Sequence, residues 1–253
     1  MQNAAIIYLV KSDSKDIYNL LDSLEKLETN FLKQFPYPVI LFHEKSLSNE
    51  WKANILLNCP DLDIRFALVE FNRTRQHNTN FDIGYCNMCQ WFAGEFAYHP
   101  ALSGLHYYLR LDTDSFILSP ILYDVFEFMA YKFLDYGYIT TMGDADHTTI
   151  GLWDAVDEFI NTYKSYSVMP NIIKESDWNR GVFYNNFEIA NLGWIRSDEY
   201  QKFFWHLKNK DGYFMHRWGD HATRYLAQML FPVKIHQFKD IHYKHQDYVN
   251  APN

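Results

Sequence analysis

The chain has 253 residues, of which 48% are hydrophobic and 18% aromatic, with 10 glycines and 8 prolines. A chain of this length and apolar content can bury one large core, which excludes a disordered protein. The formal net charge of −8 argues against a nucleic-acid partner, because phosphate backbones need clustered Lys and Arg side chains.

Predicted strands and helices alternate along the chain. Apolar, β-rich runs predict strands at 4–10, 37–42, 64–69, 106–111, 136–141 and near 233–238. Helical periodicity predicts helices at 14–33, 49–57, 82–98, 121–133, 152–166, 198–208 and 220–230. This alternation indicates an α/β fold with a Rossmann-like, mostly parallel sheet flanked by helices on both faces. We expect a single catalytic domain, 1–253, with a nucleotide-binding lobe at about 1–115 and an acceptor and catalytic lobe at 116–253.

Targeting and cysteine signals are weak. No apolar run approaches the roughly 20 residues of a membrane span, and the N-terminus lacks the basic leader of a signal peptide. Cys86 and Cys89 form a C-x-x-C pair, but no second pair has zinc spacing, so a structural role is favoured. Asn72 begins an N-glycosylation triplet, a short pattern that carries little weight by itself.

Two carboxylates follow the predicted strand 106–111. Ligands collect beyond the carboxyl ends of strands in α/β sheets, and Asp112-x-Asp114 lies at such an end. If the backbone stays extended there, both side chains project to one face and need a cation such as Mg²⁺ or Mn²⁺ between them. The motif alone is also common as a turn or a helix cap. An EF-hand loop is excluded, because Ile117 stands where that loop has Gly and Tyr123 where it has Glu.

Six sequence blocks resemble, in order and with similar gaps, those of the fungal Golgi α-1,2-mannosyltransferases (glycosyltransferase family 15). The central block Y-Y-L-R-L-D-T-D at 107–114 is similar to the family's Y-Y-W-R-V-E-P-D. The others are Y-C-N-M-C with H-P-A-L at 85–102, Y-G-Y with L-W at 136–153, N-F-E-I-A with R-S-D at 186–198, R-W-G-D at 217–220, and D-I-H-Y-K-H at 240–245.

The resemblance implies a GT-A-type fold and a retaining glycosyltransferase that moves mannose from GDP-mannose to a sugar hydroxyl. It also implies Mn²⁺ as cofactor, with Mg²⁺ as the alternative, and a glycan or glycoprotein acceptor. If an anchor has been removed, the resemblance implies that the protein is located in the Golgi lumen. Otherwise we expect a soluble, cytoplasmic protein. The rival readings are the same fold with another nucleotide-sugar donor, a non-catalytic glycan-binding relative, and a glycoside hydrolase.

The resemblance also implies a metal site. Asp112 takes the place of the family's metal-binding Glu, Asp114 matches the last carboxylate of that motif, and His245 matches a C-terminal metal-binding His. His242 is the rival ligand, because Lys244 replaces the first His of the family's pair. An imidazole beside carboxylates is a reasonable shell for Mn²⁺.

Glu188 is the predicted catalytic residue. It stands in an apolar, strand-like context, where a buried charge is costly without a partner or a task. The family likeness makes it the nucleophile or the electrostatic stabiliser of a retaining reaction, by analogy with retaining glycosidases. The structural alternative is a buried Glu bonded to neighbouring backbone or to an Arg.

The remaining predictions concern substrate binding. Tyr85 and Arg110 fall where the family contacts the donor, with Asp112 and Asp114, and a phenol or guanidinium there strengthens its hydrogen bonds as charge develops. Arg110 has the alternative of pairing with a strand-end Asp. Lys11, after the first strand, replaces a family Arg and is a further donor-binding candidate.

For the acceptor, the candidates are Asp144 and Asp220. Asp144 falls where the family has a Glu near the acceptor pocket. Asp220 follows Gly219 at a predicted helix start, so a helix N-cap explains it nearly as well as sugar binding.

Overall fold

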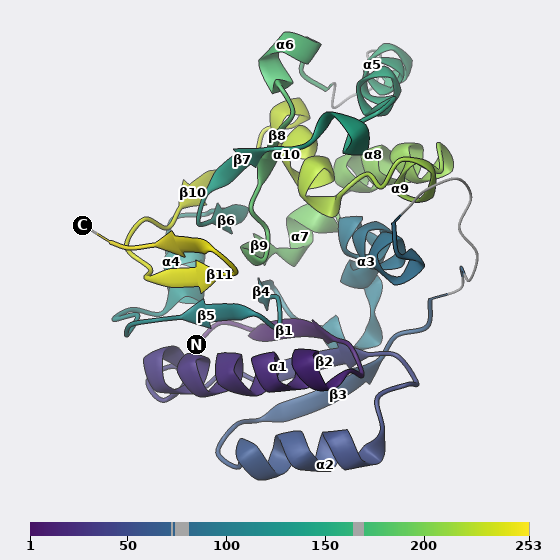
Figure 1. Cartoon of the computed structure of the whole chain (residues 1–253). Coiled ribbons are helices and arrows are strands. Elements are labelled where there is room, and N and C mark those ends of the chain that lie inside the picture. The colour runs from purple at the N-terminus through teal and green to yellow at the C-terminus, as the bar shows by residue number, and fades with distance from the viewer. Residues whose placement is uncertain (72, 74–80, 164–169, 253) are drawn as a thin grey trace.

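The centre of the molecule is a seven-stranded sheet, seen in a computed structural model that describes residues 1–71, 73, 81–163 and 170–252 (Figure 1). The strand order is β10-β6-β9-β4-β1-β2-β3. The strands are β1 Ala4–Val10, β2 Val39–His43, β3 Ile64–Leu68, β4 Tyr107–Leu111, β6 Tyr136–Tyr138, β9 Phe187–Asn191 and β10 Ile235–Gln237. Strand β9 runs antiparallel to β4 and β6, and the other pairs are parallel. The mixed, mostly parallel sheet predicted from sequence is confirmed.

Helices cover both faces of this sheet because side chains alternate along its strands. In β1, Ala4, Ile6 and Tyr8 pack on one side, while Ala5 and Ile7 pack on the other. The first side is covered by α1 Ser14–Leu27, α2 Asn49–Asn58 and α4 Val125–Tyr131. The second is covered by α3 Ile83–Ala93, α5 Leu152–Tyr163, α8 Asp198–Asn209 and α10 Asp220–Leu230. Figure 1 shows α1 and α2 on the side of the strands opposite to α3 and α8.

Short elements complete the two ends of the sheet. A three-stranded sheet joins β5 Ser115–Ile117, β11 Tyr243–His245 and β12 Tyr248–Asn250, and a two-stranded one joins β7 Thr141–Gly143 and β8 Gly181–Phe183. The short helices are α6 Glu175–Trp178, α7 Leu192–Ile195 and α9 Gly212–Met215, with a π-helical turn at Glu28–Leu32 and 3₁₀ turns at Glu95–Tyr98, Pro100–Leu102 and Asp146–Thr148. Figure 1 shows β11, near the C-terminus, lying beside β5.

Several predicted boundaries differ from the observed ones for local reasons. Helix α4 starts at Val125 rather than 121, because the Asp124 side chain accepts the N–H groups of Phe126 and Glu127 and caps it there. The strand predicted at 136–141 ends at Tyr138, and the chain then crosses to the two-stranded sheet. The last residues of the helix predicted at 152–166 lie outside the described part of the chain, as does Asn72.

Two weaker sequence signals have simple structural counterparts. Cys86 and Cys89 are buried, and neither is in a disulfide, which agrees with the structural role favoured for the C-x-x-C pair. No helix in the described ranges combines the length and the apolar character that a bilayer crossing requires.

The packing around Gly137 on β6 is tight enough to predict how a substitution there changes stability. A Cβ at Gly137 would overlap the Phe238 ring and lie 3.3 Å from Met129 Sδ. Gly137→Ala should therefore lower the free energy of unfolding by roughly 1–3 kcal/mol, measured by urea titration. Gly143→Ala on β7 is the matched control, because its Cβ would meet no atom within 4 Å. Equal stability of the two variants would contradict this packing.

Candidate active site

A cavity of about 660 Å³ lies at the carboxyl ends of β1 and β4, where α/β sheets commonly bind ligands. Lys11 follows β1 and residues 112–114 follow β4, and both line the cavity. The other walls include Tyr85 on α3, Asn185 before β9, and Asp220 at the start of α10. The site is therefore built from segments that are distant in sequence.

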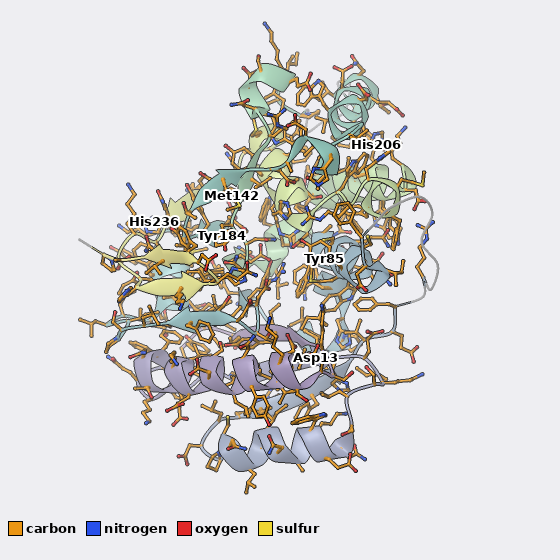
Figure 2. The ribbon with its side chains drawn as sticks, in the orientation of Figure 1. Asp13, Tyr85, Met142, Tyr184, His206 and His236 are labelled. Carbon is orange, nitrogen blue, oxygen red and sulfur yellow. The ribbon has the colours of Figure 1, made fainter. Side chains whose placement is uncertain are left out.

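The side-chain view places the lining residues relative to other candidates. Figure 2 shows Asp13, Tyr85, Met142 and Tyr184, all of which line the cavity, around the middle of the molecule. His236, one of three histidines in the C-terminal segment, is at the side of the molecule and is absent from the residues that line the cavity. Its ring packs against the rings of Phe128 and Phe238, at centroid distances of 4.9 and 4.8 Å, so it has a packing role.

Strand β4 ends in a turn rather than in extended backbone. The N–H of Ser115 donates to the carbonyl of Asp112 at 3.0 Å, which closes the turn. The extended backbone expected for Asp112-x-Asp114 is therefore wrong, although both residues line the cavity. Asp112 accepts from the Arg110 guanidinium at 3.1 and 3.2 Å, whereas Asp114 contacts His245.

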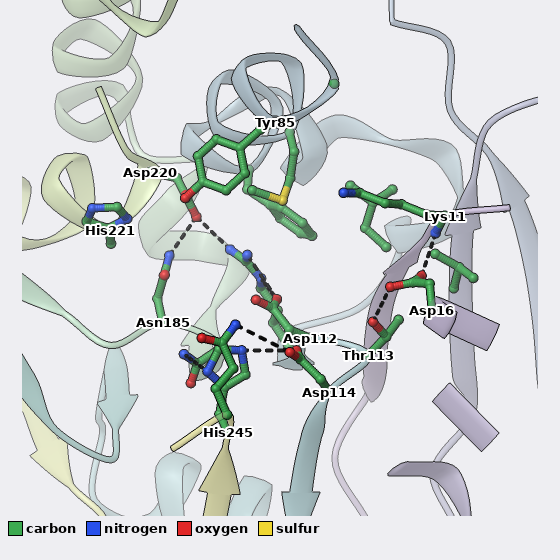
Figure 3. A pocket seen from close by; sticks show the side chains of 18 of the residues that line it. Lys11, Asp16, Tyr85, Asp112, Thr113, Asp114, Asn185, Asp220, His221 and His245 are labelled. Atoms are coloured by element: carbon green, nitrogen blue, oxygen red, sulfur yellow. Dashed lines mark hydrogen bonds and ion pairs between the residues drawn. The ribbon is translucent and has the colours of Figure 1, made fainter. Parts of the chain in front are cut away.

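Asp114 and His245 form a pair inside the cavity (Figure 3). Strand β11 pairs with β5 so that His245 is opposite Ser115, and this register brings its ring to Asp114. His245 Nε2 lies 3.0 Å from Asp114 Oδ1, and this hydrogen bond lowers the pKa of Asp114 despite its partial burial. The other ring nitrogen, Nδ1, contacts Tyr184 Oη at 2.6 Å and Asn186 Nδ2 at 3.1 Å. These contacts fix the orientation of the ring.

Only one of the two rival histidines lines this cavity. His245 does so, while His242 precedes β11 and contributes its backbone carbonyl to a hydrogen bond from the Leu118 N–H at 2.8 Å. Within the described part of the chain, no three His, Cys, Asp or Glu side chains converge into a ready metal cluster. The protein therefore offers the Asp114 and His245 pair, with Asp112 nearby on the same turn.

Arg110 is buried between two carboxylates. Its Nη1 donates to Asp220 Oδ2 at 2.5 Å, its Nε and Nη2 donate to Asp112, and its Cζ lies 3.8 Å from the Phe92 ring centroid. Burial lowers the pKa of Arg110, but the charges of Asp112 and Asp220 outweigh burial and leave that pKa raised. With 2% of its side chain exposed, Arg110 pairs with the strand-end Asp, the alternative that the sequence left open.

Asp220 does not cap helix α10. Gly219 is the N-cap residue and makes no side-chain cap bond, whereas the Asp220 carboxylate accepts from Arg110 and, at 2.6 Å, from Asn185 Nδ2. Burial raises the pKa of Asp220, yet the Arg110 charge outweighs it and keeps that pKa low. The N-cap alternative for Asp220 is wrong.

Glu188 lies beneath the cavity rather than in its lining. Its side chain has no solvent exposure, and its two oxygens accept from Tyr108 Oη at 2.7 Å and Tyr136 Oη at 2.9 Å. Arg224 Nε is 3.5 Å from the same carboxylate, and its Nη groups donate to the carbonyls of Phe92 and Ala93 at the end of α3. This agrees with the structural alternative in that a buried Glu is paired with an Arg, but the pair is an ion pair in which Arg224 Nε makes no hydrogen bond.

The rim of the cavity is organised around Asp144. Its Oδ2 lies 3.0 Å from His221 Nε2, and its Oδ1 accepts from Thr148 Oγ1 at 2.9 Å. Burial raises the pKa of Asp144, but the hydrogen bond and charge of His221 outweigh it and lower that pKa to about 2. Arg217 Nη1 is 3.9 Å from this carboxylate, and Arg217 Nη2 donates to Tyr85 Oη at 2.8 Å.

Lys11 is exposed at the opposite end of the cavity. Its backbone N–H donates to Asp16 Oδ2 at 2.7 Å, and Thr113 Oγ1 donates to Asp16 Oδ1 at 2.6 Å. Through these two hydrogen bonds, Asp16 connects the end of β1 to the turn after β4. Figure 3 shows Asp16 and Thr113 beside Lys11. Burial raises the pKa of Asp16, and the hydrogen bond from Thr113 opposes that rise.

Sequence reasoning missed several residues of this site. Asp16, Asn185, His221 and Arg217 received no role, although Asn185 precedes the N-F-E-I block and Arg217 begins the R-W-G-D block. For Asn185 and Arg217, the signal that could have indicated a role was a polar residue within or beside a recognised motif. Asp16 has no such signal, because only the fold brings it to Thr113.

The mixed sheet with an acidic pocket at its strand ends is the arrangement of the GT-A-type glycosyltransferase fold. A sequence profile of the family described as glycolipid 2-alpha-mannosyltransferase matches residues 63–253. The chain belongs to this family of fungal Golgi mannosyltransferases.

Individual relatives resemble the chain over almost its whole length. It is 29% identical over 284 residues to the probable mannosyltransferase KTR4 of Saccharomyces cerevisiae, a match that covers 98% of this chain and 61% of that protein. The glycolipid 2-alpha-mannosyltransferase of the same yeast is 28% identical, covering 97% of this chain and 61% of its own length. The chain thus spans about three fifths of these two relatives.

Two solved structures share the fold closely. Core-mannan synthase A (CmsA/Ktr4) of Aspergillus fumigatus, in a Mn/GDP form, has a TM-score of 0.89 and 27% identity, covering 100% of this chain and 77% of its own. The S. cerevisiae mannosyltransferase Ktr4p in complex with GDP has a TM-score of 0.88 and 28% identity, covering 99% and 73%. The predicted GT-A-type fold is confirmed.

The environment of Glu188 predicts a stability effect. Glu188→Gln removes the charge that compensates buried Arg224, and should lower the free energy of unfolding by about 3–5 kcal/mol in a denaturant titration. The matched control is Glu158→Gln, which breaks the exposed ion pair with Lys210 and should leave stability unchanged. A fully stable Glu188→Gln protein without transfer activity would instead support the catalytic role predicted from the sequence.

Proposed function

We propose that this chain transfers mannose from GDP-mannose to a hydroxyl group of a glycan or glycoprotein, with a divalent cation, Mn²⁺ before Mg²⁺. Membership of the mannosyltransferase family supports the reaction class. The GDP and Mn/GDP forms of the two solved relatives support the donor nucleotide and the metal. Retention of configuration is part of the proposal, because GDP-mannose is an α-glycoside and the family is named for α-mannosyl transfer.

The Asp114 and His245 pair is the single observation that carries the metal-dependent part of this proposal. Ligand atoms about 2.1 Å from an octahedral cation lie roughly 3 Å apart when they are at right angles. The 3.0 Å between Asp114 Oδ1 and His245 Nε2 matches that separation. A carboxylate and an imidazole form a mixed donor set that suits Mn²⁺. Asp112 is the third candidate ligand, although Arg110 holds one of its oxygens.

The cation would neutralise the charge of the departing diphosphate, an effect typically worth several kcal/mol. The protein's own contribution is to hold the groups around that charge. We assign donor binding to Lys11, which is exposed in the cavity, and to Tyr85. We assign Arg110 the task of positioning Asp112 and Asp220, because its donors are engaged by these two carboxylates.

Acceptor binding is proposed for the side of the cavity that holds Asp144 and Asp220. Both carboxylates keep a low pKa, so both are ionised near neutral pH and accept hydrogen bonds from sugar hydroxyl groups. The cavity collects residues from the segments before and after residue 115, which supports the proposed division into a nucleotide-binding lobe and an acceptor lobe.

For the cell location, we propose the Golgi lumen. The sequence blocks of this chain resemble those of the fungal Golgi α-1,2-mannosyltransferases, which supports this location. A glycan-binding protein without activity is disfavoured by the enzymatic names of the relatives.

A donor screen tests the function as a whole. The protein is incubated with Mn²⁺, a mannoside acceptor and a panel of nucleotide sugars, and the release of each nucleotide is measured. GDP-mannose should be consumed, and EDTA should abolish the reaction until Mn²⁺ is restored. Consumption of a different nucleotide sugar would refute the donor assignment, and unchanged activity in EDTA would refute the metal requirement.

The metal pair can be tested without turnover. Saturating GDP with Mn²⁺ should raise the melting temperature of the native protein by several degrees, since a ligand at about 100 times its Kd adds about 2.7 kcal/mol to stability. Asp114→Asn and His245→Gln should each lose the Mn²⁺-dependent part of this shift. His236→Gln is the control, because its ring packs outside the cavity. A full shift in the Asp114 and His245 variants would exclude the pair as metal ligands.

A further inference from the structure

Arg217 has an unusual backbone conformation. Its φ is 61°, in the left-handed region that costs a non-glycine residue about 1 kcal/mol or more. The next residue, Trp218, is buried against Gly212, and its indole nitrogen donates to the carbonyl of Ile150 at 2.8 Å. Trp218 thus anchors the turn in the core, while Arg217 lines the cavity. A side chain held at the site by a strained backbone indicates a task there.

The guanidinium of Arg217 is held by aromatic rings. Its Cζ lies 4.7 Å from the Tyr85 ring centroid and 5.3 Å from that of Phe81. Its Nη2 donates to Tyr85 Oη at 2.8 Å, and its Nη1 is 3.9 Å from Asp144 Oδ1. Arg217 therefore connects the donor-binding Tyr85 with the acceptor-binding Asp144. Its fork geometry makes such a double contact possible, which the single ammonium of Lys does not.

The hydrogen bond from Arg217 determines how the Tyr85 hydroxyl can use its own proton. Because Tyr85 Oη accepts a hydrogen bond from Arg217, its own proton is left to be donated elsewhere. Cys89 lies one turn further along α3 and is close enough to affect the pKa of Tyr85. Sulfur is a weak acceptor, so an anionic phosphate oxygen in the cavity would be the better acceptor for the Tyr85 proton. Burial raises the pKa of Tyr85, and the Arg217 charge opposes that rise only in part, so the hydroxyl keeps a proton to donate.

We propose that Arg217 is a positioning residue that orients the Tyr85 hydroxyl to donate its proton to the diphosphate of the bound donor. The hydrogen bond from Tyr85 strengthens as the diphosphate gains charge on leaving. It therefore stabilises the transition state more than the bound donor. Arg217 acts through Tyr85 and is distinct from Arg110, whose donors are engaged by Asp112 and Asp220. This inference rests on the proposed function, because it requires a nucleotide-sugar donor in the cavity.

A double-mutant cycle tests the inference. Transfer rates are compared for the native protein, Tyr85→Phe, Arg217→Gly and the double variant, at saturating donor. Each single change should lower kcat about tenfold or more, with a smaller effect on KM. The double variant should fall no more than about threefold below the worse single variant, because both changes remove one interaction. Multiplicative losses, or an Arg217→Gly protein with native kcat, would overturn the inference.

Glycine is chosen at 217 because it adopts φ of 61° without strain, so loss of folding is not the expected cause of the effect. Arg180→Gly is the matched control. Arg180 has a φ of 54°, pairs with Asp146 at 3.0 Å and does not line the cavity, so its loss should leave kcat unchanged. Melting temperatures of both glycine variants should equal or exceed that of the native protein. A fall in the melting temperature of Arg217→Gly alone would mean that Arg217 serves the fold.

The donor in this assay is chosen from the panel of nucleotide sugars. Use of a donor other than GDP-mannose would refute the proposed donor and still allow the cycle to be measured. A native protein that transfers no sugar from any donor refutes the proposed function and this inference together. A cycle without coupling in a protein that does use GDP-mannose refutes the inference alone.

Discussion

The site depends on one buried guanidinium. Arg110 leaves β4 on the side that faces α10 and meets two carboxylates there, Asp112 from its own strand end and Asp220 from the helix. A charge buried to this degree requires partners, because an unpaired guanidinium in the interior is costly. The pairing therefore fixes the distance between a strand of the central sheet and a helix that arrives about a hundred residues later.

A second buried ion pair, whose residues do not line the cavity, also joins α10 to the central sheet. Arg224, also on α10, reaches Glu188 on β9 and the carbonyl groups at the end of α3. Two tyrosine hydroxyls donate the hydrogen bonds to that carboxylate, while Arg224 Nε faces it at 3.5 Å as an ion pair. Together the two arginines hold β4, β9, α3 and α10 in a single arrangement.

The cavity above these pairs has three chemically distinct parts. One end carries exposed Lys11 next to the Asp16 and Thr113 contact, and suits an anionic nucleotide. The middle holds the Asp114 and His245 pair. The rim around Asp144 is polar, with His221 and Arg217 beside it, and suits hydroxyl groups. The proposed nucleotide, metal and acceptor subsites would thus follow one another along the cavity, as the proposed transfer of a sugar from a diphosphate requires.

The sequence by itself determined six of the seven strands of the central sheet, most of the long helices and the motif at the end of β4, because apolar periodicity and strand-end acids are local signals. It also pointed to Asp114 and His245, through the family resemblance. Only the tertiary structure decided that Asp112 faces Arg110, that Glu188 lies under the cavity, and that Arg217 reaches Tyr85. Each of these depends on a turn, a register or a left-handed residue that brings distant segments together. A one-dimensional pattern carries no record of such contacts, since they arise from the packing of the whole chain.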